Sequence, residues 1–258
     1  MKAIWTGAIG FGLVNIPVKI YSAIHDSSLD LDMLDKKDYS RIRFQRINER
    51  TGKEVQWGNI VKGFDLDGKY VVLTDEDFEK ASPEKSKIIE IKEFVAESEI
   101  ESIFFEMPYY LEPQKSGEKA YTLLREALNK SGKVGLGSFV LRSKENLCVL
   151  KPTENIIILN KLRFAEEIRD PKELKIPSTA PVKKEELKMA MALVNQLTGK
   201  FDIEQYRDNY SDALMKLIKA KAKGKSINTP QLRVVHNKTK DLMEQLKASL
   251  ETKKKRAS

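Results

Sequence analysis

Basic side chains gather in one short stretch of the sequence, between residues 36 and 53. Seven Lys and Arg residues stand there against two acids, Asp38 and Glu49, which leaves a net charge of +5. The seven are Lys36, Lys37, Arg41, Arg43, Arg46, Arg50 and Lys53. The planar fork of arginine matches phosphate oxygens, and such contacts supply affinity and position without reading bases. Composition alone favours two interpretations equally: a nucleic-acid contact, or a hairpin whose charges only keep it soluble.

The other reactive side chains do not assemble into an active site. Neither His25 nor His236 has a serine or cysteine context that suggests a nucleophile–base pair. The acids at 75–77 resemble metal ligands, but they follow Thr74 directly, where acids also stabilise a helix N-terminus. We favour the capping role. The glycine clusters and "KAKGKS" lack the spacing of nucleotide-binding loops. We therefore expect no cofactor, no metal site and no enzymatic activity.

The charge of the whole chain is sorted along its length. The formal net charge is +8, and residues 221–258, with 11 basic and 3 acidic residues, account for all of it. Residues 63–106 have the opposite bias, with 13 acids and 5 lysines. A basic stretch, an acidic flank and a basic tail on one chain indicate a polyanion bound at a defined place.

The cysteine content and the apolar N-terminal segment indicate the cellular compartment in which we expect the protein. Cys148 is the single cysteine, which excludes an internal disulfide and a cysteine-based zinc site, and indicates a reducing compartment. The apolar start is interrupted by Gly7, Gly10 and Pro17, so we expect a buried strand and not a signal peptide. No stretch is long enough to span a membrane, and we expect a cytoplasmic protein.

Alternating apolar residues predict a β-rich core before residue 170. The basic stretch falls in a predicted hairpin, in which Arg41 and Arg43 share one strand face and Arg46 takes the other. Prolines punctuate residues 107–113. Three later strands recur about ten residues apart, which suits an antiparallel barrel. The predicted strands are one or two within 3–24, the hairpin strands 41–48 and 54–63 around a turn at 49–52, and then 68–74, 85–95, 102–107, 137–143, 146–152 and 155–162.

Helical patterns follow the apolar period of 3.6 residues. Residues 116–130 form a predicted amphipathic helix whose inward residues are Ala120, Leu123, Leu124, Ala127 and Leu128. After the proline-rich linker at 171–181, two further helices are predicted at 182–199 and 202–224, each with an apolar stripe that needs a partner surface. The stripes are Leu187, Met191, Val194 and Leu197 in the first, and Tyr206, Tyr210, Leu214, Leu217 and Ile218 in the second. A last helix is predicted near 239–251, before the basic tail "TKKKRAS".

The order of these segments resembles the bacterial Ku proteins of non-homologous end joining. The resemblance is carried by "AIWTGAIGFGLVNIPVKIYSA", "IVKGF", "KYVVLTDEDFE", "PYYLEP", "GEKAYTLLREAL", "FVLRSKENLCVLKP", "EIRDP" and "LTGKFDIEQYRDNYSDALMKLIKAKAKGK", and it runs over about residues 2–225. It implies a mixed β/α fold: a Ku-type antiparallel β-barrel core with a long bridging hairpin and a C-terminal helical dimerisation arm. The implied domains are 1–175 for the core, with the bridge at about 36–63, then 176–225 for the arm and 226–258 for a ligase-docking helix and basic tail. The eukaryotic Ku subunits carry an additional N-terminal domain that this chain is too short to contain.

The resemblance also assigns roles to residues. Arg41–Trp57 falls on the bridge that crosses the DNA, so the seven basic residues above become DNA contacts. Arg142 and Lys144 fall near the DNA cradle. The tail residues Lys253, Lys254, Lys255 and Arg256 resemble a shortened lysine-rich tail that adds DNA contact. The two apolar stripes fall on the dimerisation arm. The segment "KDLMEQLKASLE", with Leu242, Met243, Leu246 and Leu250, resembles the segment that recruits DNA ligase D.

One feature departs from the family. Many bacterial members place cysteines near the bridge turn, whereas this chain has "RINERTG" there, without a cysteine. A metal-stapled bridge is therefore excluded, and the turn must be held by Gly52 and by strand pairing.

The resemblance implies a non-enzymatic binder of double-stranded DNA ends that acts as a ring-shaped homodimer and recruits DNA ligase D. When bound to DNA it would associate with the nucleoid. Two other functions stay open from the residues alone. One is an architectural DNA-binding protein without end preference. The other is a metal-dependent nuclease that uses Asp75 and Asp77.

Overall fold

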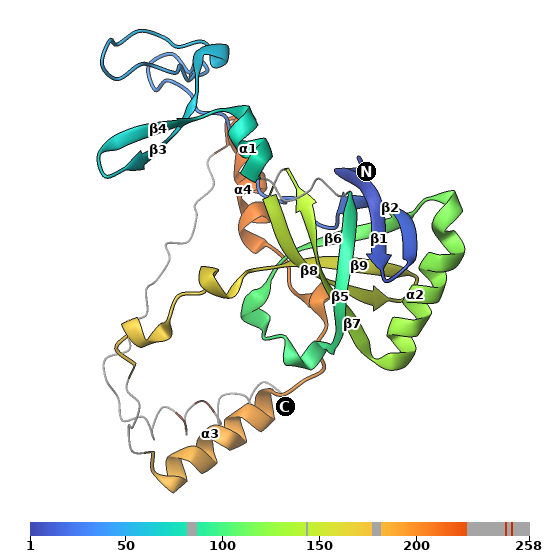
Figure 1. The fold of residues 1–258 in the computed structure, drawn as a ribbon. Coiled ribbons are helices and arrows are strands. Elements are labelled where there is room, and N and C mark those ends of the chain that lie inside the picture. Colours follow the sequence, from blue (N-terminus) through green and yellow to red (C-terminus); the bar gives the residue numbers. More distant parts are fainter. Residues whose placement is uncertain (82–86, 143, 177–181, 226–245, 247–248, 250–258) are drawn as a thin grey trace. The chain divides into compact units, whose positions relative to one another are not determined.

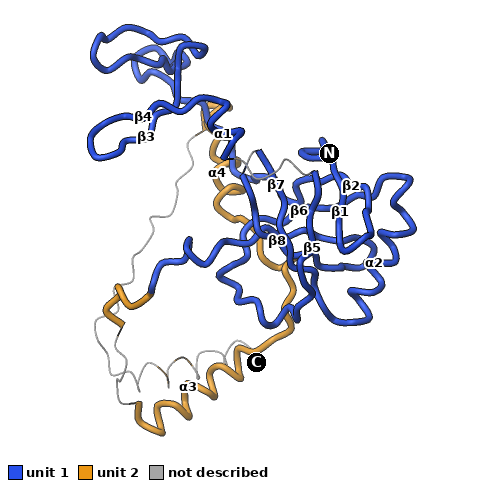
Figure 2. The backbone as a smooth tube through the Cα atoms, viewed as in Figure 1, with its two compact units in different colours: residues 1–170 blue, residues 171–258 orange. Residues whose placement is uncertain are grey.

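The computed structural model describes residues 1–258 except 82–86, 143, 177–181, 226–245, 247–248 and 250–258. Contacts between residues divide the chain into two compact units, Met1–Asp170 and Pro171–Ser258 (Figure 2).

Seven strands of the first unit close a β-barrel (Figure 1). Its strand order is β1-β2-β6-β9-β8-β7-β5, and β5 returns to β1. All neighbours are antiparallel except β1 and β5, which pair in parallel and close the barrel. The predicted antiparallel barrel is confirmed, with this one parallel seam. The strands are β1 (Trp5–Phe11), β2 (Val14–Ser22), β5 (Ile88–Ala96), β6 (Phe105–Pro113), β7 (Lys133–Leu141), β8 (Lys144–Thr153) and β9 (Ile156–Leu162).

Alternation along the strands fills the barrel interior. Ile16, Val18 and Ile20 of β2 are fully buried, while the residues between them are partly exposed. Because side chains of a strand point to opposite faces in turn, this pattern places one face inside. Cys148 lies in the same core, and burial raises the pKa of its thiol far above the ordinary value. Gly137 of β7 lies where β5 passes closely: a Cβ there would collide with the backbone carbonyl of Glu90.

Helix α2 (Glu118–Ser131) is fastened to the barrel by a buried tyrosine. The hydroxyl of Tyr121 donates to the Leu111 carbonyl oxygen over 2.7 Å and accepts from the Ile157 amide over 2.6 Å, so it joins neighbouring strands β6 and β9. Leu124 and Leu128 are buried as predicted. Leu123 is 71% exposed, so its predicted inward orientation is wrong. It lies at the edge of the apolar stripe, and the barrel contacts the side that carries Tyr121.

Two local predictions concern the Thr74 cap and the prolines of residues 107–113, and the structure bears out the first but shows no break at the second. Thr74 caps α1 (Asp75–Ala81) as predicted, because the Asp77 amide donates to its hydroxyl over 3.3 Å. The prolines of 107–113, by contrast, do not interrupt β6. Pro113 is its last residue, and a register shift against β9 between Phe105 and Pro108 accommodates the other.

The predicted hairpin is present only next to its turn, where Ile47 pairs with Glu54 and the Val55 amide donates to the Arg46 carbonyl oxygen over 2.7 Å. The predicted continuous strands 41–48 and 54–63 are wrong. Two isolated bridges, Leu34 to Arg41 and Ile47 to Glu54, replace a continuous ladder. The described two-stranded ladder lies further on, between β3 (Lys62–Leu66) and β4 (Lys69–Leu73), and a 3₁₀ helix (Trp57–Asn59) precedes it. The reason is physical: exposed residues on both faces give strands at 41–63 no apolar surface to pack on, and unsupported hairpins are marginal.

Over residues 182–225, the second unit has two α-helices of equal length, α3 (Lys184–Leu197) and α4 (Asn209–Ala222). The predicted start of the second helix at 202 is wrong. The Asp208 carboxylate accepts from the amides of Tyr210 (3.0 Å) and Ser211 (3.1 Å), and so caps α4, while Asp202 caps a separate 3₁₀ turn, Ile203–Gln205. Among the described residues, no helix has the length and apolar character needed to cross a membrane.

Candidate nucleic-acid interface

The first of two tight turns in the basic stretch presents Lys36 and Lys37. The Asp35 amide donates to the Ser40 carbonyl oxygen over 2.8 Å, and the Asp35 carboxylate accepts from the Lys37 amide over 2.8 Å. The Asp38 carboxylate accepts from the Ser40 amide over 2.9 Å. This hydrogen bond, followed by one from the Ser40 side chain, lowers the pKa of Asp38. Backbone amides thus donate hydrogen bonds to both carboxylates of this turn, while the side chains of both lysines are exposed.

The second turn presents Arg50 and Lys53. Asn48 organises this turn. Its side-chain oxygen accepts from the backbone amides of Arg50 (3.1 Å) and Thr51 (3.0 Å). Its backbone amide donates to the Lys53 carbonyl oxygen over 2.9 Å. Gly52 has a φ of +67°, a conformation that glycine adopts without strain. Gly52 and a short antiparallel pairing, Ile47 with Glu54, thus support this turn as predicted, and the Asn48 side chain adds further hydrogen bonds.

The three arginines between the turns differ in their surroundings. Arg41 forms an ion pair with Asp32 at 2.8 Å, and the two side chains are 78% and 61% exposed. The Arg46 guanidinium lies over the Trp57 ring, 4.5 Å from its centroid. Arg43 is exposed and lines a shallow hollow beside Arg41. The segment that carries these arginines is not a continuous strand. Strand alternation therefore gives no reason for Arg41 and Arg43 to share one face.

The geometry of this stretch suits a polyanion. All seven basic side chains are exposed, and short local hydrogen bonds hold the backbone that carries them. Exposed cations on an ordered backbone can contact successive phosphates with little further loss of conformational freedom. Their spread over two turns favours contact with a backbone of repeating charges.

Arg142 and Lys144 lie at the other candidate contact, the connection between β7 and β8. Arg142 has a φ of +53°, which is typical of a tight hairpin turn, and Lys144 begins β8. Both side chains are exposed. Neighbouring Glu145 is 4.0 Å from Lys92, which leaves the tip of the hairpin basic.

The acids at 75–77 do not form a metal site in the structure. Asp77 accepts from the Thr74 amide over 2.9 Å and from its hydroxyl over 2.8 Å, and these bonds lower the pKa of Asp77. The carboxylate thus completes a reciprocal cap. Over the described residues, no group of three or more His, Cys, Asp or Glu side chains is placed to hold a metal ion.

The predicted dimerisation residues lie on exposed or half-buried surfaces of the second unit. Leu187, Met191, Val194 and Leu197 of α3 are 52–58% exposed and form one stripe. On α4, Tyr210 and Ile218 are exposed, and Leu214 and Leu217 are half-buried. Tyr206 is exposed but lies outside α4, at the end of the 3₁₀ turn that precedes it.

The predicted C-terminal residues fall mostly outside the described part of the chain. Leu246 is described, as a half-buried helical residue. The predictions that lie outside the described residues concern Leu242, Met243, Leu250, Lys253, Lys254, Lys255 and Arg256.

Two residues of the candidate interface were not predicted from the sequence. Asp32 positions Arg41, and Trp57 positions Arg46. A tryptophan within reach of several arginines is a recognisable signal for cation–π stacking. Asp32 is one of several acids near the basic stretch, and the sequence does not distinguish it from the others.

Comparison with known proteins identifies the family. The family model described as the Ku70/Ku80 β-barrel domain matches residues 10–189. A protein of Archaeoglobus fulgidus named "Non-homologous end joining protein Ku" is 41% identical over 256 residues, covering 98% of this chain and 100% of its own length. Relatives of the same name from Coxiella burnetii and Bacillus subtilis are 39% and 38% identical, covering 98% and 97% of this chain and 96% and 82% of their own lengths.

The family model spans most of the barrel together with the basic stretch, and the relatives extend over both compact units. The segment order, the closed seven-stranded barrel and these matches agree. The chain is a member of the Ku family.

Proposed function

We propose that this protein binds the ends of double-stranded DNA without sequence preference, as a ring-shaped homodimer, in the repair of double-strand breaks by non-homologous end joining. It acts as a binding protein and not as an enzyme, and it works on DNA in the nucleoid. The observation that carries the proposal is the set of seven exposed Lys and Arg side chains on two hydrogen-bonded turns of a Ku-family chain.

Sequence-independent binding follows from the chemistry of the basic stretch. Lysine and arginine contact phosphate oxygens, which are the same in every sequence, and the release of counterions drives the association. A protein that must accept any broken end gains nothing from reading bases. Arg142 and Lys144, at the tip of a barrel hairpin, extend the same kind of contact.

The homodimer rests on the apolar stripes of α3 and α4. Four large apolar side chains on α3 are more than half exposed, which is unfavourable unless another surface covers them. A second copy offers that surface and lets two chains enclose a duplex. In this proposal residues 1–175 hold the DNA and residues 176–225 join the two copies.

Recruitment of DNA ligase D is assigned to residues 226–258. Leu242, Leu246 and Leu250 recur every four residues, with Met243 beside them, a spacing suited to docking of a helix in an apolar groove. The lysines and arginine at 253–256 add electrostatic attraction to DNA.

Comparison of a linear duplex with a closed circle of the same sequence tests end binding. We expect the purified protein to bind the linear form and not the circle, because a ring needs an end to thread. Equal binding to both forms, without stimulation of the ligase, would support an architectural DNA-binding protein instead. Metal-dependent cleavage that is lost on Asp75→Ala would support a nuclease.

A further inference from the structure

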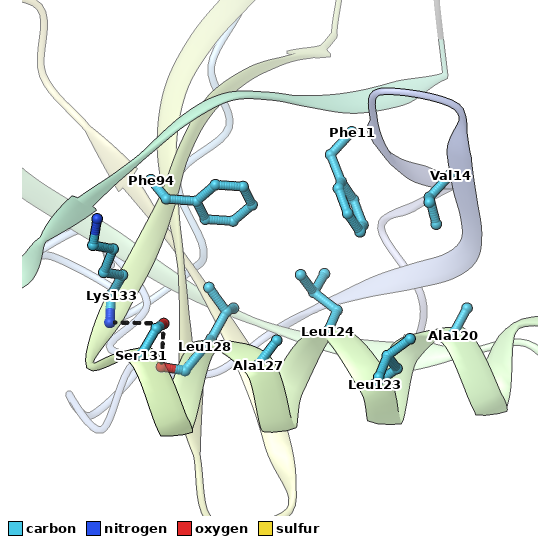
Figure 3. Close-up of a pocket in the computed structure, with 10 residues that line it drawn as sticks. All are labelled: Phe11, Val14, Phe94, Ala120, Leu123, Leu124, Ala127, Leu128, Ser131 and Lys133. Atoms are coloured by element: carbon cyan, nitrogen blue, oxygen red, sulfur yellow. Dashed lines mark hydrogen bonds between the residues drawn. The ribbon is translucent and has the colours of Figure 1, made fainter.

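An apolar groove of about 650 Å³ runs along α2 on the first unit (Figure 3). One wall is the stripe of α2 that includes Leu123 and Ala127. The facing wall consists of Phe11 and Val14, beside the turn between β1 and β2, and Phe94 of β5. The rings of Phe11 and Phe94 meet edge to face at 6.3 Å, which fixes this wall.

The groove is apolar and accessible. Leu123 is 71% exposed, Val14 41% and Phe94 40%, although all three lie among apolar neighbours. Ser131, one of its two polar lining residues, donates its hydroxyl to the Leu128 carbonyl oxygen over 3.2 Å and accepts from the Lys133 amide over 3.4 Å. The groove therefore offers few hydrogen bonds to a polar small molecule, and it favours apolar side chains.

The rim of the groove is basic on the side formed by α2. On the solvent side of Leu123, the helical period places Lys119, Glu126 and Lys130 in one row, and Lys133 follows at the end of α2; all four are exposed. Three lysines against one glutamate attract acidic residues. The α3 stripe of a second copy does not complement this rim, because Lys184 and Lys188 flank it.

We propose that this groove is a docking site for a short acidic segment of another protein, which inserts two or three large apolar side chains between α2 and the β1–β2 turn. The apolar lining of α2 recurs at 120, 123, 124, 127 and 128 over more than two turns. That length matches the anchor spacing of a short amphipathic helix. The groove shares no residue with the sets assigned to DNA contact and to dimerisation, and its docking role does not depend on the proposed function.

The test uses two fluorescein-labelled peptides of about 14 residues with leucines at helical spacing, one with glutamates and one with lysines between them. Full-length protein should bind the acidic peptide about tenfold more tightly than the basic one. Leu123→Glu should weaken binding of the acidic peptide at least about tenfold, because it places a negative charge on the α2 wall of the groove. Val14→Glu, on the opposite wall, should act in the same direction.

Matched variants separate the groove from the general charge of the protein. Ile103→Glu changes the net charge equally but alters an exposed residue of the first unit outside the lining, so it should leave binding unchanged. Lys130→Glu should weaken binding of the acidic peptide about two- to fivefold. Lys87→Glu, seven residues before Phe94 and so roughly 23 Å away along the chain, should have little effect.

Three results would overturn the proposal. One is equal binding of the acidic and basic peptides. Another is equal loss of binding in Ile103→Glu and Leu123→Glu, which would indicate charge attraction alone. The third is loss of self-association in Leu123→Glu during sedimentation, which would assign the groove to a second copy. Thermal unfolding of each variant checks that it is folded, and DNA binding should be unchanged in Leu123→Glu and in Ile103→Glu.

Discussion

Replacing Arg41, Arg43 and Arg46 with glutamine removes three of the seven charges of the basic stretch and keeps side chains that form hydrogen bonds. We expect weaker binding to DNA ends and a shallower dependence on salt, because fewer counterions are released. Arg41 must exchange Asp32 for phosphate in the complex, which costs little because both side chains are mostly exposed. Replacement of the same three arginines with glutamate should abolish end binding and leave the dimer intact.

The salt dependence of binding gives the expected size of the effect on DNA affinity. Each phosphate contact contributes about 0.9 to the slope of log K against log salt, so the variant should lose about 2.7 from the slope per chain. If two copies hold one duplex, the loss should be about 5.4. For seven contacts, a rise from about 50 to about 200 mM salt lowers affinity roughly 6,000-fold, whereas four contacts give only roughly 150-fold.

Fluorescence anisotropy with a duplex that has one blunt end and one hairpin-capped end measures this slope. Replacement of Lys87, Lys115 and Lys119 with glutamine is the matched control, because these exposed lysines belong to the barrel unit but not to the predicted DNA contacts. An equal change in slope for both triple variants, or no change for the arginine variant, would refute the assignment of the basic stretch to phosphate.

The remaining predictions concern assembly and stability. Leu187→Glu should convert the dimer to monomers in sedimentation velocity, since it places a charge in the α3 stripe; an unchanged dimer would remove α3 from the interface. Gly137→Ala should lower the free energy of unfolding by more than about 1 kcal/mol, because the new Cβ meets backbone, while Gly58→Ala, in open space, should change it by less than about 0.5 kcal/mol. Tyr121→Phe should cost about 1–3 kcal/mol by leaving two buried backbone groups without their hydroxyl partner, and a change near zero in denaturant unfolding would contradict this. The Cys148 thiol should resist alkylation in the folded protein at neutral pH, because burial raises its pKa and blocks access, and should react once the chain is unfolded.

The barrel could be predicted from the sequence because its signal is local. Strands that bury one face alternate with period two, and β7, β8 and β9 follow one another with two-residue turns. The alternation in residues 41–44 has the same form but a different origin. Its arginines and apolar residues are all exposed, so a pattern that indicates a half-buried strand occurs in a segment without a core.

The start of α4 and the orientation of Leu123 were predicted wrongly because the sequence does not distinguish between the alternatives. Asp202 and Asp208 are both suitable N-cap residues, and only the structure shows that the second one starts α4. For Leu123, helical spacing gives the stripe but not the position of the barrel relative to it. The exposure of the seven basic residues was predictable, whereas their partners Asp32 and Trp57 were not, because those contacts join residues separated along the chain.

The parallel seam between β1 and β5 has a consequence for how the chain folds. The 65 residues between Ser22 and Ile88 act as one long loop that leaves the barrel after β2 and returns at β5. Closing a loop costs about 0.6 kcal/mol more for each doubling of its length, so this loop costs only about 2 kcal/mol more than an eight-residue one. The barrel cannot close until β9 has been synthesised, and its folding should be slow and dominated by distant contacts. The same arithmetic means that the loop could lengthen or shorten substantially during evolution at little cost to the barrel.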